Sequence, residues 1–420
     1  MGEKQTIRVL GIESSCDETA AAIVHVARTR DRGRWRYAFD VRSNVVASQV
    51  KTHAKYGGVV PEIAARAHVE AIIPVIDEAV GLRKFDAVAV TSGPGLVTSL
   101  AVGVETARTI AFARQLPVIG VNHIEGHILS ALLKPGREEQ GTGNRRQETQ
   151  HVPMSHVSYP MFPTVCLVVS GGHTELLLMR GWGKYELIGA TRDDAVGEAF
   201  DKVAKLLGLG YPGGPIVSQR AAQGDAAAFD LPRPMMDSDD FDFSFSGLKT
   251  AVRYMISPPP ARRGRVRGGR ARAVISERNR IVNNTTPSHS PCGARGEPSE
   301  AEGGEQVGTP KRRKEVSDIC ASFQQAAVDV LVAKTVRAAR EFGAKAVLLG
   351  GGVAANTQLR HQLGNALQQE IPAITYHLST INYCGDNAAM IAAAGGVRLL
   401  SGQQTPWKRL DVNPNWELGR

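Results

Sequence analysis

Two histidines four residues apart are the first side chains in this sequence with the spacing of metal ligands. His123 and His127 stand in the segment His-Ile-Glu-Gly-His, between an apolar run that ends at Val121 and a second apolar run. Residues at positions i and i+4 of a helix share one face, so both imidazoles can bind one ion. Two ordinary histidines at the start of a helix would have the same spacing, and the motif alone leaves both interpretations open.

Glu125, between the two histidines, does not complete the motif of the zinc peptidases. In His-Glu-x-x-His the glutamate directly follows the first histidine and acts as general base. Glu125 lies two positions from either histidine, so we expect it on another face of the helix. The spacing therefore argues against a metallopeptidase, and a third ligand must come from another part of the chain.

Asp386 is the candidate for that third ligand. It stands in Cys-Gly-Asp-Asn, directly before an apolar run that is typical of a helix. An aspartate at the start of a helix is also a common N-cap, and the two roles are compatible. Two imidazoles and a carboxylate with open positions would suit Fe²⁺ or Zn²⁺ rather than Mg²⁺.

Small turns rich in Gly and Ser form a second kind of candidate site. The run Val-Val-Ser-Gly-Gly at 168–172 ends a strand-like segment in a turn whose backbone N–H groups can approach phosphate oxygens. Taken alone, a Gly-Gly hairpin turn is more often only a turn. The phosphate interpretation gains from a second turn of this design, which carries Asp17 and Glu18.

Asp201, Gly214 and Asn356 are candidates for binding a nucleoside. Asp201 lies in a predicted helix, as a solvated charge or as a carboxylate that binds a ribose hydroxyl. The Gly213-Gly214 turn would admit the sugar or base closely. Asn356 ends a Gly-rich loop and either binds the same nucleoside or caps a helix.

The elements that must position these residues occur twice along the chain. A strand, a small polar turn and a second strand are predicted at 7–26 and again at 164–179. A buried-type strand that runs into a Gly-rich loop and a helix is predicted at 86–95 and again at 344–356. We therefore predict an α/β fold of two similar lobes that face each other across a cleft, where a nucleotide-like ligand would bind.

Two stretches interrupt this pattern and define the expected domains. The N-terminal lobe is predicted at 1–133, and the C-terminal lobe at 160–256 and 317–420, with its final helices returning towards the N-terminal lobe. A polar loop is expected at 134–159. The basic, Pro- and Gly-rich segment 257–316 is expected to be a disordered insertion, either a plain solvated loop or a flexible arm that attracts RNA phosphates.

Charge, cysteines and hydropathy exclude several classes of protein. The segment 257–316 holds 13 Lys and Arg against 6 Asp and Glu, which is seven of the nine net positive charges, so the total charge is weak evidence for a nucleic-acid partner. Five scattered cysteines favour a reducing compartment over a disulfide framework. We expect no membrane segment, because no apolar stretch reaches about 18 residues. The absence of an Arg- and Ser-rich leader favours the cytoplasm.

Taken together, these segments resemble the TsaD family, the threonylcarbamoyl-transfer component of tRNA modification, once called glycoprotease. The matching stretches are Gly-Ile-Glu-Ser-Ser-Cys-Asp-Glu-Thr at 11–19, Tyr-Gly-Gly-Val-Val-Pro-Glu-Ile-Ala-Ala-Arg at 56–66, Thr-Ser-Gly-Pro-Gly-Leu at 91–96, His-Ile-Glu-Gly-His at 123–127, Val-Val-Ser-Gly-Gly-His-Thr at 168–174, Gly-Glu-Ala-Phe-Asp-Lys-Val-Ala-Lys at 197–205, Phe-Ser-Gly-Leu-Lys-Thr at 245–250, Gly-Gly-Val-Ala-Ala-Asn at 351–356 and Tyr-Cys-Gly-Asp-Asn at 383–387. Only the two interrupting stretches and a short basic run at 28–36 fall outside the resemblance.

The resemblance implies an actin-like fold of duplicated ribonuclease H-like lobes, and it implies roles for particular residues. The metal ligands would be His123, His127 and Asp386, with Fe²⁺ favoured and Zn²⁺ the alternative. No general base is assigned. The site for the threonylcarbamoyl-adenylate would be lined by Val168, Val169, Ser170, Gly171, Gly172, Asp201, Gly214 and Asn356.

The reaction implied by the resemblance is transfer of the threonylcarbamoyl group from threonylcarbamoyl-AMP to N6 of the adenosine 3′ of the anticodon, position 37, in ANN-decoding tRNAs. The metal would act as a Lewis acid. The partners would be tRNA, a related actin-like subunit and a small P-loop ATPase, with a separate synthase making the intermediate. This sequence has no Walker motif of its own.

Three other functions would use parts of the same pattern. An actin-like ATPase or sugar kinase binds Mg²⁺ through carboxylates, so the histidine pair would be superfluous. A non-catalytic scaffold subunit of the same fold would not need the two histidines and the aspartate. A metallopeptidase is disfavoured by the position of Glu125.

Overall fold

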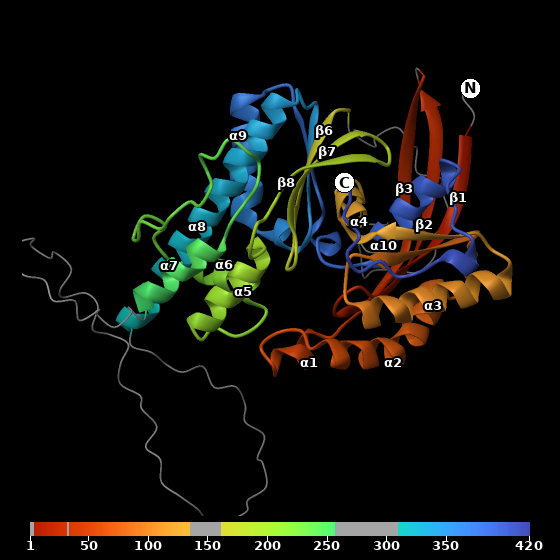
Figure 1. Cartoon of the computed structure of the whole chain (residues 1–420), viewed down its shortest axis with the longest axis horizontal. Coiled ribbons are helices and arrows are strands. Elements are labelled where there is room, and N and C mark those ends of the chain that lie inside the picture. Colours follow the sequence, from red (N-terminus) through yellow and green to blue (C-terminus); the bar gives the residue numbers. More distant parts are fainter. Residues whose placement is uncertain (1–3, 32, 135–160, 257–309) are drawn as a thin grey trace, which may run out of the picture.

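Two five-stranded mixed sheets form the framework of the molecule (Figure 1). The computed structural model describes residues 4–31, 33–134, 161–256 and 310–420. The N-terminal sheet has the order β3-β2-β1-β4-β5, and the C-terminal sheet the order β10-β9-β6-β7-β8. Their strands are β1 (Lys4–Glu13), β2 (Glu18–Asp31), β3 (Arg34–Ser48), β4 (Ala87–Gly93), β5 (Val118–Asn122), β6 (Thr164–Val169), β7 (Thr174–Gly181), β8 (Lys184–Ala190), β9 (Ala346–Gly350) and β10 (Thr375–Leu378).

The two sheets share one topology. In the first, β1 pairs antiparallel with β2 and parallel with β4, and β4 continues parallel with β5. In the second, β6 pairs antiparallel with β7 and parallel with β9, and β9 continues parallel with β10. The fold is thus a duplicated α/β unit, and the prediction of two similar lobes is confirmed.

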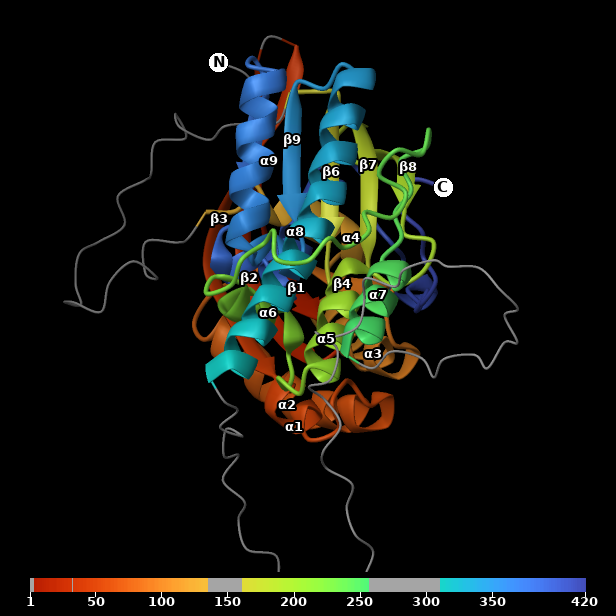
Figure 2. The same ribbon diagram turned by 90° about the vertical axis from the view of Figure 1, so that its left-hand side faces the viewer.

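Separate groups of helices cover the outer faces of the sheets. Among the helices α1 (Val50–Ala54), α2 (Pro61–Val80) and α3 (Val97–Arg114), the last two pack on the N-terminal sheet through a core that includes Leu10, Ile72 and Val104. The C-terminal sheet is covered by α5 (Val196–Leu206), α6 (Gly213–Ala221), α7 (Ser246–Ile256), α8 (Pro310–Glu341) and α9 (Thr357–Glu370). Figure 2 shows α8 and α9 in front of β6 and β9.

Two helices lie between the sheets and join the lobes (Figure 1). The helices are α4 (His123–Ser130), which follows β5, and α10 (Ala388–Leu400), which follows β10 by way of a short 3-10 turn. One continuous core contains apolar side chains of α4 and α10 together with those of β1, β2, β6 and β7. Each helix stands after the last strand of its own lobe, so the duplicated topology places both at the interface.

The composition of α10 explains its central position. Residues 388–397 are all buried, as expected for a helix that is apolar on every side. Small residues allow close packing: a Cβ on Gly11 of β1 would lie 2.2 Å from the carbonyl oxygen of Ala388. A Cβ on Gly395 would lie 2.3 Å from Ala89 Cβ. The helix therefore packs directly on the N-terminal sheet.

Helix α8 begins inside the basic segment that the sequence predicted to be a disordered insertion. It begins at Pro310, so residues 310–316 of the predicted insertion are helical, and 257–309 lie outside the described residues. The polar loop predicted at 134–159 also lies outside them, apart from Lys134. Within the described ranges, α8 is long and apolar enough to cross a membrane, but 67% of its apolar window is buried inside the protein. It is a core helix of the C-terminal lobe.

A candidate metal centre between the lobes

The first two candidate ligands sit at the start of α4. The side chain of Asn122 caps this helix by accepting a hydrogen bond from the backbone N–H of Ile124 at 2.8 Å. His123 is therefore the first helical residue, and His127 follows one turn later. Both imidazoles are buried, with ring centroids 4.6 Å apart. The predicted helix start is confirmed, and these are not two surface histidines.

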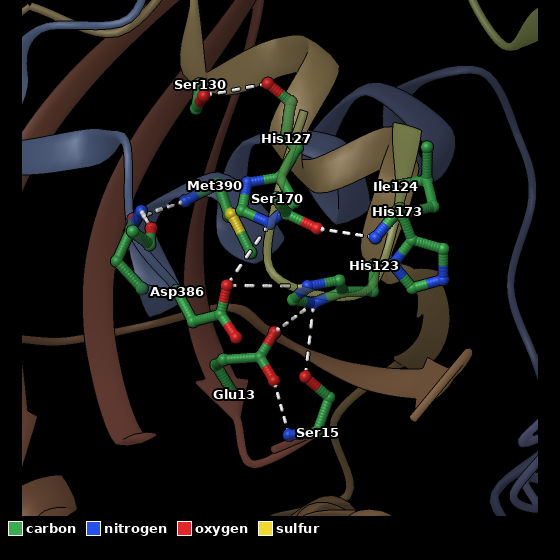
Figure 3. Close-up of polar contacts among 12 residues, drawn as sticks. Glu13, Ser15, His123, Ile124, His127, Ser130, Ser170, His173, Asp386 and Met390 are labelled. Atoms are coloured by element: carbon green, nitrogen blue, oxygen red, sulfur yellow. Dashed lines mark hydrogen bonds and ion pairs between the residues drawn. The ribbon is translucent and has the colours of Figure 1, made fainter. Parts of the chain in front are cut away.

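Asp386 faces the two imidazoles from the start of α10 (Figure 3). The N-cap of α10 is the next residue, Asn387, whose side chain accepts from the N–H of Met390 at 3.1 Å. The interpretation of Asp386 as a plain helix cap is therefore wrong. Its Oδ1 lies 3.5 Å from His123 Nε2 and 3.2 Å from His127 Nε2.

The three side chains fit one divalent ion. One ligand atom of each lies within 4.8 Å of the other two. Ligands bound to one tetrahedral zinc at about 2.0–2.1 Å lie roughly 3.3 Å apart, close to the distances observed here. Among the described residues, neither ring nitrogen of His127 has a hydrogen-bond partner of good geometry, although Nε2 is near Asp386. A buried imidazole without a partner is costly, and a metal bond would satisfy it.

The electrostatics of the cluster also favour a cation. Burial alone would raise the pKa of Asp386, but the nearby imidazoles outweigh it and hold the pKa well below its usual range. Burial and the charge of His123 lower the pKa of His127. An ionised carboxylate beside a neutral imidazole is the protonation state that a metal requires of its ligands.

Glu13 is a residue of this site that the sequence analysis did not single out. It ends β1, is fully buried, and its Oε2 lies 3.1 Å from His123 Nδ1 (Figure 3). The same carboxylate accepts from Ser15 N and from Thr91 Oγ1, both at 2.6 Å. A carboxylate on Nδ1 holds a proton on that side of the imidazole, so that Nε2, which faces Asp386, is the nitrogen that would bind a metal.

His173 is a second residue that was missed. It follows the Gly-Gly turn after β6, and its ring lies beside His123 (Figure 3). Burial, reinforced by the charges of His123 and His127, lowers the pKa of His173 to about 4, so it is neutral at physiological pH. The turn motif was the only sequence signal for it.

The predicted phosphate turn is open on its outer side. Val168 and Val169 are buried in β6, and Ser170 closes the turn by donating its N–H to the carbonyl oxygen of His173 at 2.8 Å. Gly171 and Gly172 are exposed, and a Cβ on either would meet no described atom within 4 Å. The backbone of Gly171 and Gly172 is therefore accessible to a ligand, while Ser170 Oγ accepts the N–H of His173 at 3.1 Å.

The three residues predicted to bind a nucleoside meet around α6. Asp201 Oδ1 accepts the N–H of Gly213 at 2.7 Å, so this carboxylate holds the start of α6 and is not a solvated charge. Burial raises the pKa of Asp201, partly offset by the N–H groups of Gly213 and Gly214. Asn356 caps α9 through the N–H of Leu359 and also donates to Ser218 Oγ at 3.0 Å.

The fold and site together define a class: a duplicated two-lobed α/β protein with a cluster of two histidines and one aspartate where the lobes meet. A model of the family described as tRNA N6-adenosine threonylcarbamoyltransferase, TsaD, matches residues 40–140 and 149–393. The chain belongs to this family.

Curated relatives cover nearly the whole chain. The protein named tRNA N6-adenosine threonylcarbamoyltransferase from Thermomicrobium roseum is 46% identical over 395 residues, covering 92% of this chain and 90% of that protein. A protein of the same name from Listeria innocua is 42% identical over 417 residues, covering 98% and 96%. Among solved structures, HypF of T. kodakarensis has a TM-score of 0.49 at 12% identity, covering 94% of this chain and 48% of that one.

Proposed function

We propose that this chain transfers the threonylcarbamoyl group from threonylcarbamoyl-AMP to N6 of the adenosine 3′ of the anticodon, position 37, in ANN-decoding tRNAs. The observation that carries the proposal is the convergence of His123, His127 and Asp386 between the lobes, in a chain of this family. Its relatives bear the name of this transferase at 42–46% identity.

The chemistry is an acyl transfer. N6 of the adenosine attacks the carbamoyl carbon, a C–N bond forms, the bond from that carbon to the phosphate oxygen breaks, and AMP leaves while N6 gives up a proton. A divalent metal held by the two histidines and the aspartate would supply Lewis-acid polarisation of the carbamoyl carbonyl. The histidine and carboxylate donors support Fe²⁺ as the proposed metal, with Zn²⁺ as the alternative.

The chain's own residues would bind and orient the two halves of the adenylate. The exposed backbone of Gly171 and Gly172 can reach the phosphate without a side chain in the way. Gly214 leaves open space beside Asp201, where the adenosine half would lie. The side-chain amide of Asn356 already hydrogen-bonds the N–H of Leu359, Ser218 Oγ and Gln324 Oε1. It would therefore shape the nucleoside site rather than bind the base.

The substrate and partners follow from this reaction. The target adenosine must leave the stack of the anticodon loop to reach a site between two lobes, which loop RNA permits at modest cost. An actin-like partner subunit, a small P-loop ATPase and a synthase that makes threonylcarbamoyl-AMP belong to the proposal. We also propose that the reaction takes place in the cytoplasm.

The test is transfer of labelled threonine to unmodified ANN-decoding tRNA by the full chain with its synthase and partner subunits. Changing both His123 and His127 to Ala should lower the transfer rate about 100-fold or more, because Lewis-acid assistance contributes several kcal/mol. His361→Ala, at an exposed position of α9, should keep the rate. Absence of transfer by the unaltered chain with every partner set would favour an ATPase or scaffold instead.

A further inference from the structure

Glu125, the middle residue of the His-Ile-Glu-Gly-His segment, forms a buried ion pair on the side of α4 away from the metal ligands. It is fully buried, and its Oε2 accepts a hydrogen bond from Nε of Arg398 at 2.6 Å and lies 2.6 Å from Nη2 of the same guanidinium. Arg398 stands in the last turn of α10, with a side chain that is 16% exposed. The pair thus joins the two helices that lie between the lobes.

The two helices cross at Gly126, next to this pair. A Cβ at Gly126 would lie 2.9 Å from Ile391 Cδ1 and 3.1 Å from Met390 Cγ, so glycine allows direct packing there. Helix α4 therefore meets α10 at three places: the ligand cluster near Asp386, the crossing at Gly126, and the ion pair at Arg398. Contacts on both sides of a crossing fix the rotation of one helix on the other.

The C-terminal tail covers the ion pair and connects it to the start of α4. The guanidinium of Arg398 lies over the ring of Trp416, 5.3 Å from its centroid. The carbonyl oxygen of Trp416 accepts from Nδ2 of Asn122 at 2.9 Å, and Asn122 is the N-cap of α4. The cap, the tail and the ion pair form one closed set of contacts around the first turn of α4.

A buried ion pair is poor evidence of stability, because apolar residues of similar volume often serve equally well. Its advantage is direction, since a charge-assisted hydrogen bond between guanidinium and carboxylate restricts the helix more than apolar contacts do. We propose that Glu125 and Arg398 are positioning residues that fix α4 on α10 and thereby hold His123 and His127 at binding distance from Asp386. The inference rests on the proposed metal site.

The experiment measures metal binding rather than transfer, using the full chain with its metal removed. Zn²⁺ affinity is determined by competition with a chromophoric chelator, the visible spectrum of bound Co²⁺ reports the ligand geometry, and thermal unfolding is followed in parallel. Glu125→Gln and Arg398→Gln should each weaken Zn²⁺ binding about 10- to 100-fold, the range for groups that orient ligands, and should shift the Co²⁺ spectrum.

A double variant separates positioning from stability, and it also serves if the single variants fail to fold. Glu125→Leu with Arg398→Met leaves no buried charge unpaired and should regain most of the thermal stability, less the contribution of the hydrogen bond between the Tyr185 hydroxyl and Glu125. We expect Zn²⁺ affinity to stay low in this variant, because apolar contacts do not replace the directed hydrogen bond between the two helices. If affinity returns together with stability, the pair only fills space and the proposal is overturned.

The control breaks a partly exposed ion pair within the C-terminal lobe, between α8 and the loop before α7. Asp329→Asn removes the charge that pairs with Arg233. The side chain of Asp329 is 30% exposed and that of Arg233 is 26% exposed. It should lower the thermal midpoint without changing Zn²⁺ affinity, and an equal loss of affinity would overturn the proposal. Failure of the unaltered chain to bind Zn²⁺ or Co²⁺ would overturn the metal site along with this inference. Unchanged affinity in the single variants would overturn the inference alone.

Discussion

His123 has a different neighbour on each of its ring nitrogens. Asp386 lies 3.5 Å from Nε2, and Glu13 lies 3.1 Å from Nδ1. Burial would lower the pKa of His123, but these two carboxylates outweigh it and raise the pKa well above its usual value. Carboxylates on both sides thus favour positive charge at this ring, and a metal ion on Nε2 would supply that charge while the proton stays on Nδ1 beside Glu13.

Changing Glu13 to Gln tests the orienting role at this scale. The amide keeps the size of the side chain but removes the charge, and its NH₂ group can face Nδ1 and favour the wrong tautomer. We expect Zn²⁺ affinity to fall about 10- to 100-fold and the ¹⁵N signals of His123 to report a changed tautomer. Glu105→Gln, on the exposed face of α3, is the control. Unaltered affinity and tautomer in Glu13→Gln would show that the contact does not orient the ring.

The sequence predicts the ligands better than the residues that orient them. His123 and His127 share a spacing that only a helix turns into a common face, so a motif suffices. Glu13 and His123 meet because β1 ends and α4 begins at the junction of the lobes, and no local pattern encodes such a contact. The cap of α10 illustrates the same limit, since Asp386 and Asn387 are both good cap residues and only the backbone decides between them.

At the scale of elements, the start of α7 is held by two neighbouring aspartates. Asp193 accepts from the backbone N–H of Phe245 at 2.8 Å. Asp194 accepts from Lys202 of α5 and from Lys249 of α7, each at 2.7 Å. Burial would raise the pKa of Asp194, but the two lysines outweigh it and lower the pKa. This carboxylate ties α5, which carries Asp201, to α7.

The depressed pKa of Asp194 predicts a dependence of stability on pH. A carboxylate whose folded pKa is lowered stabilises the folded state above its unfolded pKa, about 3.9, and loses that contribution as pH falls through the folded value. The difference in free energy of unfolding between the unaltered chain and Asp194→Asn should therefore be large at pH 7 and shrink by pH 3. Urea unfolding at both pH values measures it.

The control for this prediction is Asp239→Asn, at an exposed position of the same lobe, which should show little difference at either pH. If the difference in free energy of unfolding between the unaltered chain and Asp194→Asn grew towards pH 3, the assignment of Asp194 as a stabilising ionised carboxylate would be contradicted.

At the scale of the whole molecule, the two lobes are joined by α4 and α10 rather than by one hinge. Apolar runs predicted a helix that begins near His123 and another that begins near Asp386, and the repeated strand–turn–strand pattern predicted the duplicated sheets. That α4 packs between both sheets was not predicted, because two histidines and a glutamate at the start of a helix are equally compatible with an exposed helix. Close approach at Gly126 places α4 against α10, and close approach at Gly11 and Gly395 places α10 against the N-terminal sheet.

Gly11→Ala tests this packing. The added methyl would lie 2.2 Å from the carbonyl oxygen of Ala388 and 2.8 Å from the N atom of Ala392, so α10 must move away from β1. We expect a loss of about 1–3 kcal/mol in stability, as for other overpacked cores, and weaker Zn²⁺ binding because Asp386 moves with the helix.

The control is Gly247→Ala in α7, where the nearest atom to the new Cβ is 3.7 Å away and the helix gains from alanine. Unchanged stability in Gly11→Ala would show that β1 and α10 are not in close contact.

Metal-assisted transfer is tested most directly by removing the metal and adding it back. The rate of a single turnover, from threonylcarbamoyl-AMP to unmodified tRNA, is compared for the full chain with its partners before chelation, after chelation, and after Fe²⁺ or Zn²⁺ is added back. Metal-assisted transfer predicts that the rate falls about 100-fold or more on chelation and returns when the metal is added back. The rate should not recover when His123 and His127 are both Ala. A chelated chain that keeps the full rate would contradict a metal-assisted transfer at this site.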